Sequence, residues 1–180
     1  MASLIKNIIT LVALVVTLYS CNQSTSLQKY FVDNQEKANF LAVDLPANIL
    51  SLDESKLTEE QKEAYKSVKK LNMLAYRLDS TNVASYETEL AKVKAILKDP
   101  KYNELMRGNT EEGKFTFNYI GDEGNIDELV LFGNANDKGF AIIRILGDDM
   151  NPSKIMQLSS AFNTSKMDTS QIGQFAEFFK

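Results

Sequence analysis

The second half of the chain alternates apolar and polar residues in the pattern of β-strands. Phe115, Phe117 and Tyr119 are separated by polar residues, which predicts a strand with one apolar face. Residues 125–133 and 139–146 predict two further strands, joined by turn-forming residues. Because the connections are short, we expect these three strands to form an antiparallel meander.

Helical spacing and capping signals predominate in the first half. Residues 27–37 predict a short helix, and residues 39–45 predict a strand. Thr58 and Gln61 have the spacing of a capping box, which predicts a helix over residues 58–70.

The next segments are less uniform. Residues 71–78 fit one face of a helix or of a strand. Residues 102–107 predict another helical turn or two, with Gly108 as a C-terminal stop. Between them, an amphipathic helix that ends before Pro100 is predicted by apolar residues at helical spacing: Tyr86, Leu90, Val93 and Leu97.

Two helices are predicted at the C-terminal end. Asn151 is a suitable N-cap for the first, with Pro152 at its first position. The second carries one apolar stripe, formed by Ile172, Phe175, Ala176 and Phe179. The predicted fold class is therefore α+β, with an antiparallel β-sheet packed against helices in a two-layer sandwich. This sheet consists of the three-strand C-terminal meander plus one or two N-terminal strands.

The two predicted hairpins suggest a register for the meander. If residues 134–138 form one loop, Glu128 lies directly opposite Arg144. If residues 121–125 form the other turn, Asn118 lies opposite Glu128. Both registers place oppositely charged or apolar partners across from each other, which favours them over a one-residue slip.

This register divides the meander into two different faces. One face is continuously apolar, so we expect the helices to cover it: Phe115, Phe117, Leu129, Leu131, Ala141, Ile143 and Ile145. The other carries the row Asn118, Glu128 and Arg144 among apolar residues that include Phe132 and Phe140. It is too apolar for a solvated sheet surface, so something covers it. The row is either a cross-strand ion pair that fixes register or, with Phe132 and Phe140, a candidate binding face.

Composition removes many kinds of chemistry. The 180-residue chain has a net charge of −4, no histidine and one cysteine. The lack of histidine excludes Ser-His-Asp, Cys-His and HExxH sites, and a single cysteine excludes intrachain disulfides and CxxC pairs. The acidic balance argues against a nucleic-acid partner. No GxSxG, P-loop or GxGxxG pattern occurs, and we expect no cofactor.

Residues 1–20 have the composition of a bacterial signal peptide. Lys6 is their only charged residue, and the eleven-residue apolar run that follows is shorter than the ~20 residues that span a bilayer. The segment ends Leu18-Tyr19-Ser20-Cys21, which resembles a lipobox, in which the cysteine is lipidated and becomes the first mature residue. Cys21 is therefore the predicted lipid attachment site, and the membrane is a predicted partner.

Residues 21–26 combine this cysteine with a short polar tether, and residues 27–180 are expected to form a single domain. Five extended residues reach at most ~18 Å at ~3.5 Å each, so the domain stays close to its membrane. Asn22 is not the aspartate that retains many lipoproteins in the inner membrane, and no acidic run of the kind found in surface-exported lipoproteins follows. By resemblance, we expect the outer membrane, facing the periplasm.

Oxygen ligands gather in the loop at residues 147–151, where Asp148 and Asp149 are weak candidates for a calcium site. The spacing is not that of an EF-hand loop, and a turn that ends in an N-cap explains the same residues. We therefore predict no metal site.

Three segments resemble one family: residues 102–106, residues 128–131 and residues 142–147 ahead of a short helix. They are similar to Bacteroidetes lipoproteins classed as domain of unknown function 4252. The resemblance covers about residues 27–160, together with the lipobox. It implies a strand at residues 71–78 and carries over no catalytic residue.

These observations predict a non-catalytic binding or interaction module of the cell envelope, with an envelope protein or an apolar ligand as its partner. The alternative is an envelope hydrolase built on carboxylates, with calcium near Asp148 and Asp149.

Overall fold

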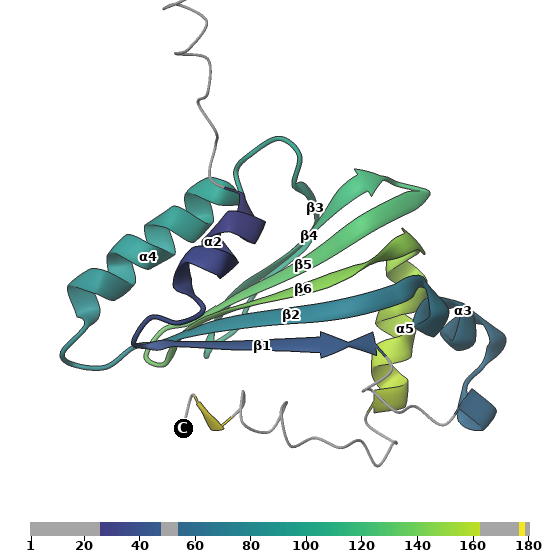
Figure 1. Cartoon of the computed structure of the whole chain (residues 1–180), viewed down its shortest axis with the longest axis horizontal. Coiled ribbons are helices and arrows are strands. Elements are labelled where there is room, and N and C mark those ends of the chain that lie inside the picture. Colours follow the sequence, from purple (N-terminus) through teal and green to yellow (C-terminus); the bar gives the residue numbers. More distant parts are fainter. Residues whose placement is uncertain (1–25, 48–53, 163–176, 179–180) are drawn as a thin grey trace, which may run out of the picture.

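The computed structural model describes residues 26–47, 54–162 and 177–178, and its centre is one antiparallel six-stranded sheet (Figure 1). The strand order is β1-β2-β6-β5-β4-β3, so β3 to β6 follow one another both in sequence and in space. The strands are β1 (Phe40–Pro46), β2 (Val68–Arg77), β3 (Asn103–Asn109), β4 (Gly113–Asp122), β5 (Asn125–Ala135) and β6 (Gly139–Met150).

Helices lie on both faces of this sheet. The α-helices are α2 (Leu27–Asn34), α3 (Glu59–Ser67), α4 (Val83–Ile96) and α5 (Pro152–Phe162), and η2 (Glu54–Lys56) is a single 3₁₀ turn. Val130 packs in a core with residues of α2 and α4, whereas its neighbour Leu129 packs with residues of α3 and α5. Adjacent strand residues point to opposite faces. The α+β class is confirmed, but the arrangement is not a two-layer sandwich.

Several local predictions are confirmed. Thr58 and Gln61 form a capping box at the start of α3. The backbone N–H of Lys154 donates to the Asn151 side chain at 3.2 Å, so Asn151 caps α5. Residues 71–78 fall almost wholly in β2, which pairs with both β1 and β6 and is therefore an inner strand.

The predicted helical turns at residues 102–107 are wrong, because this segment is the edge strand β3. Gly108 does not end a helix. It lies opposite Phe115, where an added Cβ would come within 2.3 Å of the Phe115 ring. The glycine thus makes room for an aromatic side chain, and the meander has four strands.

The predicted registers are each offset by two residues. Glu128 pairs with Leu146 and Arg144 with Val130, because β5 and β6 continue into the predicted loop and leave only residues 136–138 between them. Gly139 adopts φ +125°, a conformation that permits the shorter loop. An offset of two preserves which face each side chain occupies.

The coverage of the two faces differs from the prediction. The continuously apolar face is covered by α3 and α5 at one end, and Phe178 packs on a cluster formed by β1, β2 and β6. The rest is open: Leu131 is 36% exposed, and a groove of about 360 Å³ is lined by Phe115, Leu131, Gly133, Ala141 and Ile143. The helices α2 and α4 instead cover the face that carries the polar row. The predicted final helix lies outside the described residues except at 177–178.

Candidate functional site

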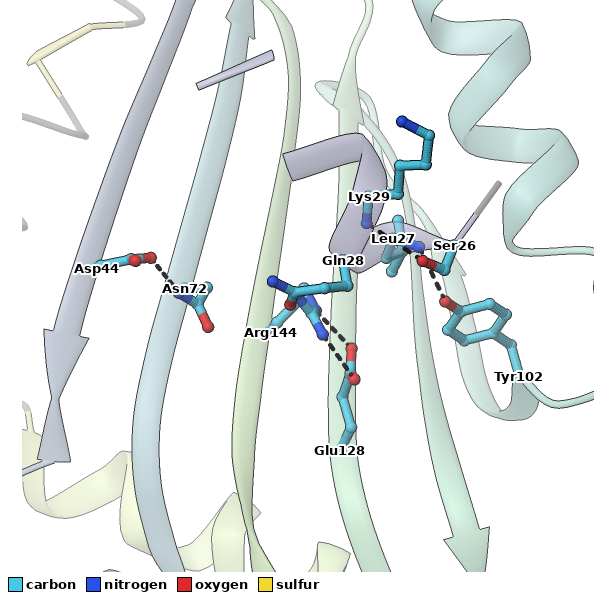
Figure 2. Close-up of polar contacts among 9 residues, drawn as sticks. All are labelled: Ser26, Leu27, Gln28, Lys29, Asp44, Asn72, Tyr102, Glu128 and Arg144. Atoms are coloured by element: carbon cyan, nitrogen blue, oxygen red, sulfur yellow. Dashed lines mark hydrogen bonds and ion pairs between the residues drawn. The ribbon is translucent and has the colours of Figure 1, made fainter. Parts of the chain in front are cut away.

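The polar row contains a buried ion pair on the face below α2 (Figure 2). The Arg144 guanidinium donates from Nε and Nη2 to the two carboxylate oxygens of Glu128, at 2.6 and 2.9 Å. Arg144 is 4% exposed and Glu128 is 8% exposed. The offset register makes this a diagonal pair rather than a directly opposed one. Two parallel charge-assisted bonds fix the geometry of the pair and occupy both carboxylate oxygens.

The helix α2 completes the enclosure of Arg144. Gln28 extends from α2 toward the pair, and its Oε1 accepts a hydrogen bond from Arg144 Nη1 at 2.6 Å (Figure 2). The Phe31 ring lies 5.3 Å from the Arg144 Cζ atom, close enough for a cation–π contact. The Arg144 guanidinium therefore contacts a carboxylate, an amide oxygen and an aromatic face.

Hydrogen bonds also join α2 to its neighbours. The backbone N–H of Leu27 donates to the Tyr102 hydroxyl at 3.3 Å, and the Tyr30 hydroxyl donates to Glu89 of α4 at 2.9 Å. Burial raises the pKa of Tyr30 far above its ordinary value, and the hydrogen bond to Glu89 raises it further. Burial also raises the pKa of Tyr102. These contacts anchor α2 over the ion pair.

The five residues of the predicted binding face are thus divided between two environments. Glu128, Arg144 and Phe140 lie under the helices, and Phe140 is 1% exposed and stacks on Tyr76 at 5.5 Å. Together with α2 they form what we call the sealed half of this face. Asn118 and Phe132 instead line a cavity of about 270 Å³ beside the end of α4.

This cavity, which we call the α4 pocket, has a mostly apolar surface, although most of its lining residues are polar or charged. It lies between the last turns of α4 and strands β3, β4 and β5, and together with Asn118 and Phe132 its lining consists of Lys94, Leu97, Lys98, Glu104, Lys114, Phe115, Thr116 and Asn134. Asn134 accepts a hydrogen bond from the Tyr86 hydroxyl of α4 at 2.5 Å, which joins the helix to β5. Burial raises the pKa of Tyr86.

Asn118 is the unusual residue of the α4 pocket. It is 4% exposed, yet its Oδ1 has no hydrogen-bond partner among the described residues. A buried polar atom without a partner costs about 1–3 kcal/mol, and most buried polar groups in proteins are paired. One residue that lines the pocket therefore has a buried acceptor without a partner among the described residues.

The charged groups of the α4 pocket are predominantly cationic. Lys94, Lys98 and Lys114 contribute three positive charges, and none of them forms an ion pair within the described ranges. The one acidic residue, Glu104, binds Arg107 through two bonds of 2.7 and 2.6 Å. Hydrogen bonding to Arg107 holds the pKa of the Glu104 carboxyl below its usual value. Glu104 is therefore already engaged and does not neutralise the lysines.

Asp148 and Asp149 lie near the end of β6. Asp148 forms an ion pair with Lys69, and Asp149 has φ +50°. In the described parts of the chain, no group of three or more acidic, histidine or cysteine residues could hold a metal ion. Cys21 and the predicted signal peptide lie outside those parts.

Sequence reasoning found the polar row but missed its partners. Gln28 and Phe31 are distant in sequence, and nothing in the short helix indicated which strand it would cover. One signal for the α4 pocket was available: Lys94 and Lys98 place two like charges close together in the sequence at the end of the predicted helix.

The fold and the pocket define a class of protein: an α+β domain with one antiparallel sheet, helices on both faces and a small, mostly apolar cavity. The family model for DUF4252, a domain of unknown function, matches residues 30–158, and the chain belongs to this family. Neither the curated proteins nor the solved structures gave a match. Among residues 26–47, 54–162 and 177–178, no helix is long and apolar enough to cross a membrane.

Proposed function

We propose that this protein is a lipid-anchored, non-catalytic binding module of the cell envelope, held by Cys21 at the outer membrane and facing the periplasm. Its ligand is a small amphiphilic molecule that occupies the α4 pocket. The observation that carries this proposal is the unpartnered Oδ1 of Asn118 within a largely apolar lining.

The shape and chemistry of the pocket support binding rather than catalysis. Ligand sites are typically apolar cavities of about 300–1,000 Å³ with a few polar groups that fix orientation. The α4 pocket, at about 270 Å³, lies just below this range and is therefore suited to a small ligand. Leu97 and Phe132 can contact an apolar chain while Asn118 accepts a hydrogen bond from a hydroxyl or amide N–H of the ligand.

The location of the pocket suits a tethered protein. Ser26 caps α2 and is five residues beyond Cys21 in the sequence. Leu27, the next residue, contacts Tyr102, which follows α4 closely. The start of α2 therefore lies near the end of α4 that borders the pocket (Figure 1).

Ligand binding is tested with N-octanoylglycinamide, a neutral amphiphile that carries an amide N–H. The full lipidated protein in phosphatidylcholine nanodiscs is titrated while NMR records the backbone amides of Leu97 and Phe132. We expect saturable shifts at these positions that are weakened at least about tenfold in Asn118→Leu, since the vacant acceptor is lost. Leu131→Ala, on the opposite face, is the matched control and leaves the affinity unchanged. The absence of saturable shifts near α4 contradicts the proposal.

Anchoring is tested separately with Cys21→Ala. Wild-type protein is expected to incorporate labelled palmitate and to sediment with outer membranes, whereas the variant does neither. A variant that is still labelled with palmitate would exclude Cys21 as the attachment site.

A further inference from the structure

The α4 pocket is predominantly positive, although the chain as a whole is negative. The protein as a whole has a net charge of −4, whereas the pocket contains three lysines and only one acidic residue, which Arg107 already neutralises. Several cations elsewhere in the protein are balanced locally. Lys29, Lys62, Lys69, Lys70, Lys92 and Lys154 all pair with a carboxylate.

Lysines at the end of a helix have an ordinary structural explanation, because they interact favourably with the negative end of the helix dipole. That explanation applies to Lys94 and Lys98. It does not apply to Lys114, which comes from β4. Lys114 of β4 converges with Lys94 of α4 and with Lys98, which follows α4. This brings like charges together without a pairing carboxylate among the described residues, which favours an anionic ligand group as the missing partner.

The three groups of the pocket specify three parts of a ligand. The lysines can hold an anionic headgroup, and the Asn118 Oδ1 can accept from a donor next to it. Leu97 and Phe132 can contact an apolar chain. Hydrogen bonds in which one partner is charged are roughly twice as strong as neutral ones, so the headgroup contributes most of the specificity.

From this arrangement we infer that the ligand of the α4 pocket is an anionic amphiphile with a hydrogen-bond donor beside its headgroup, bound through Lys94, Lys98 and Lys114. This inference rests on the proposed binding function and adds the charge of the ligand. A free acyl amino acid and the headgroup region of an anionic lipid both have this chemistry.

The test compares three probes on the full lipidated protein in phosphatidylcholine nanodiscs. N-Octanoylglycine has the acyl chain, the amide N–H and a carboxylate. N-Octanoylglycinamide lacks the negative charge, and decanoate lacks the amide N–H. We expect N-octanoylglycine to bind at least about tenfold more tightly than either of the others.

Charge-neutralising variants locate the effect. The triple variant Lys94→Gln, Lys98→Gln, Lys114→Gln is expected to weaken the binding of N-octanoylglycine at least about tenfold. Its affinity for N-octanoylglycinamide should be unchanged. The matched control makes the same change in charge at the other end of the sheet, with Lys62→Gln, Lys66→Gln and Lys69→Gln. It should alter neither affinity.

The outcomes separate this inference from the proposed function. Equal binding of the charged and neutral probes, unaffected by the triple variant but lost in Asn118→Leu, overturns the anionic ligand and keeps the binding pocket. Failure of all three probes overturns both.

Replacing part of the phosphatidylcholine with phosphatidylglycerol then distinguishes the source. If this lipid competes with N-octanoylglycine, the ligand is a lipid headgroup. If it does not compete, the ligand is a soluble amphiphile. Either result is consistent with an anionic ligand.

Discussion

The sealed half and the α4 pocket lie on the same face of the same sheet, yet they treat polar groups in opposite ways. In the sealed half, Arg144 has a carboxylate, an amide oxygen and an aromatic ring as partners. In the pocket, Asn118 has no partner for its Oδ1, and three lysines lack a carboxylate among the described residues. Satisfied polar groups stabilise a unique packing, whereas unsatisfied ones are a cost that a ligand can remove.

Along this one row of residues, some side chains stabilise the fold and another lines the candidate binding pocket. Asn118, Glu128 and Arg144 looked equivalent in the sequence. The structure makes Glu128 and Arg144 a support for α2 and places Asn118 in the lining of the α4 pocket. Substitutions in the two regions should therefore have opposite consequences.

The largest effect is expected from Glu128→Leu. Removal of the carboxylate leaves the buried Arg144 cation without its main partner, which should lower the free energy of unfolding by about 3–5 kcal/mol. Urea denaturation followed by circular dichroism measures this. The double variant Glu128→Leu, Arg144→Met removes both charges and should recover most of the loss. A single variant as stable as wild type would show that the pair is not a support.

A smaller loss is expected from Gln28→Ala. This change removes one hydrogen bond to a charged group, which corresponds to about 1.5 kcal/mol. The same denaturation experiment measures it, with Gln35→Ala, an exposed position just beyond α2, as the control. An equal change in both variants would mean that the Arg144 contact contributes nothing specific.

Asn118→Leu should change stability in the other direction. Removing the unpartnered acceptor is expected to raise the free energy of unfolding by about 1 kcal/mol while ligand binding is lost. Denaturation and titration of the same protein sample check both outcomes. A destabilised variant would indicate that Asn118 is satisfied in the folded protein.

The smallest effect concerns alkaline pH. Tyrosines of the unfolded chain ionise near pH ~10, whereas the pKa of Tyr30 is raised in the folded protein, so the unfolded state binds fewer protons above that pH. Stability contributed by the raised pKa is therefore lost as pH rises above ~10. Tyr30→Phe should make this decline shallower, as measured by denaturation between neutral and alkaline pH. An unchanged slope would contradict the burial of the phenol.

Local chemistry made much of this fold predictable. The capping box at Thr58, the N-cap at Asn151 and the alternation around Phe117 each depend on neighbours within a few residues. The failures have a different origin. Residues 103–109 form a strand because β4 offers a free edge and Gly108 admits the Phe115 ring, and both facts are tertiary.

The candidate site shows the same division. The Glu128–Arg144 pair could be predicted from alternation alone, because an error of two residues in register keeps both side chains on one face. The helix that covers the pair could not be predicted, since an apolar face does not specify which helix packs on it. The pocket depends on where α4 ends relative to β3, β4 and β5, which no local pattern encodes.

Photo-crosslinking tests most directly whether the ligand binds in the α4 pocket. The probe is an N-octanoylglycine that carries a photoreactive diazirine in its acyl chain. The lipidated protein is irradiated with the probe, and labelled peptides are mapped by mass spectrometry. We expect labels at residues 94–98 and 114–118, which border the α4 pocket. Labels confined to Leu131, Ala141 and Ile143, in the groove on the opposite face, would contradict it.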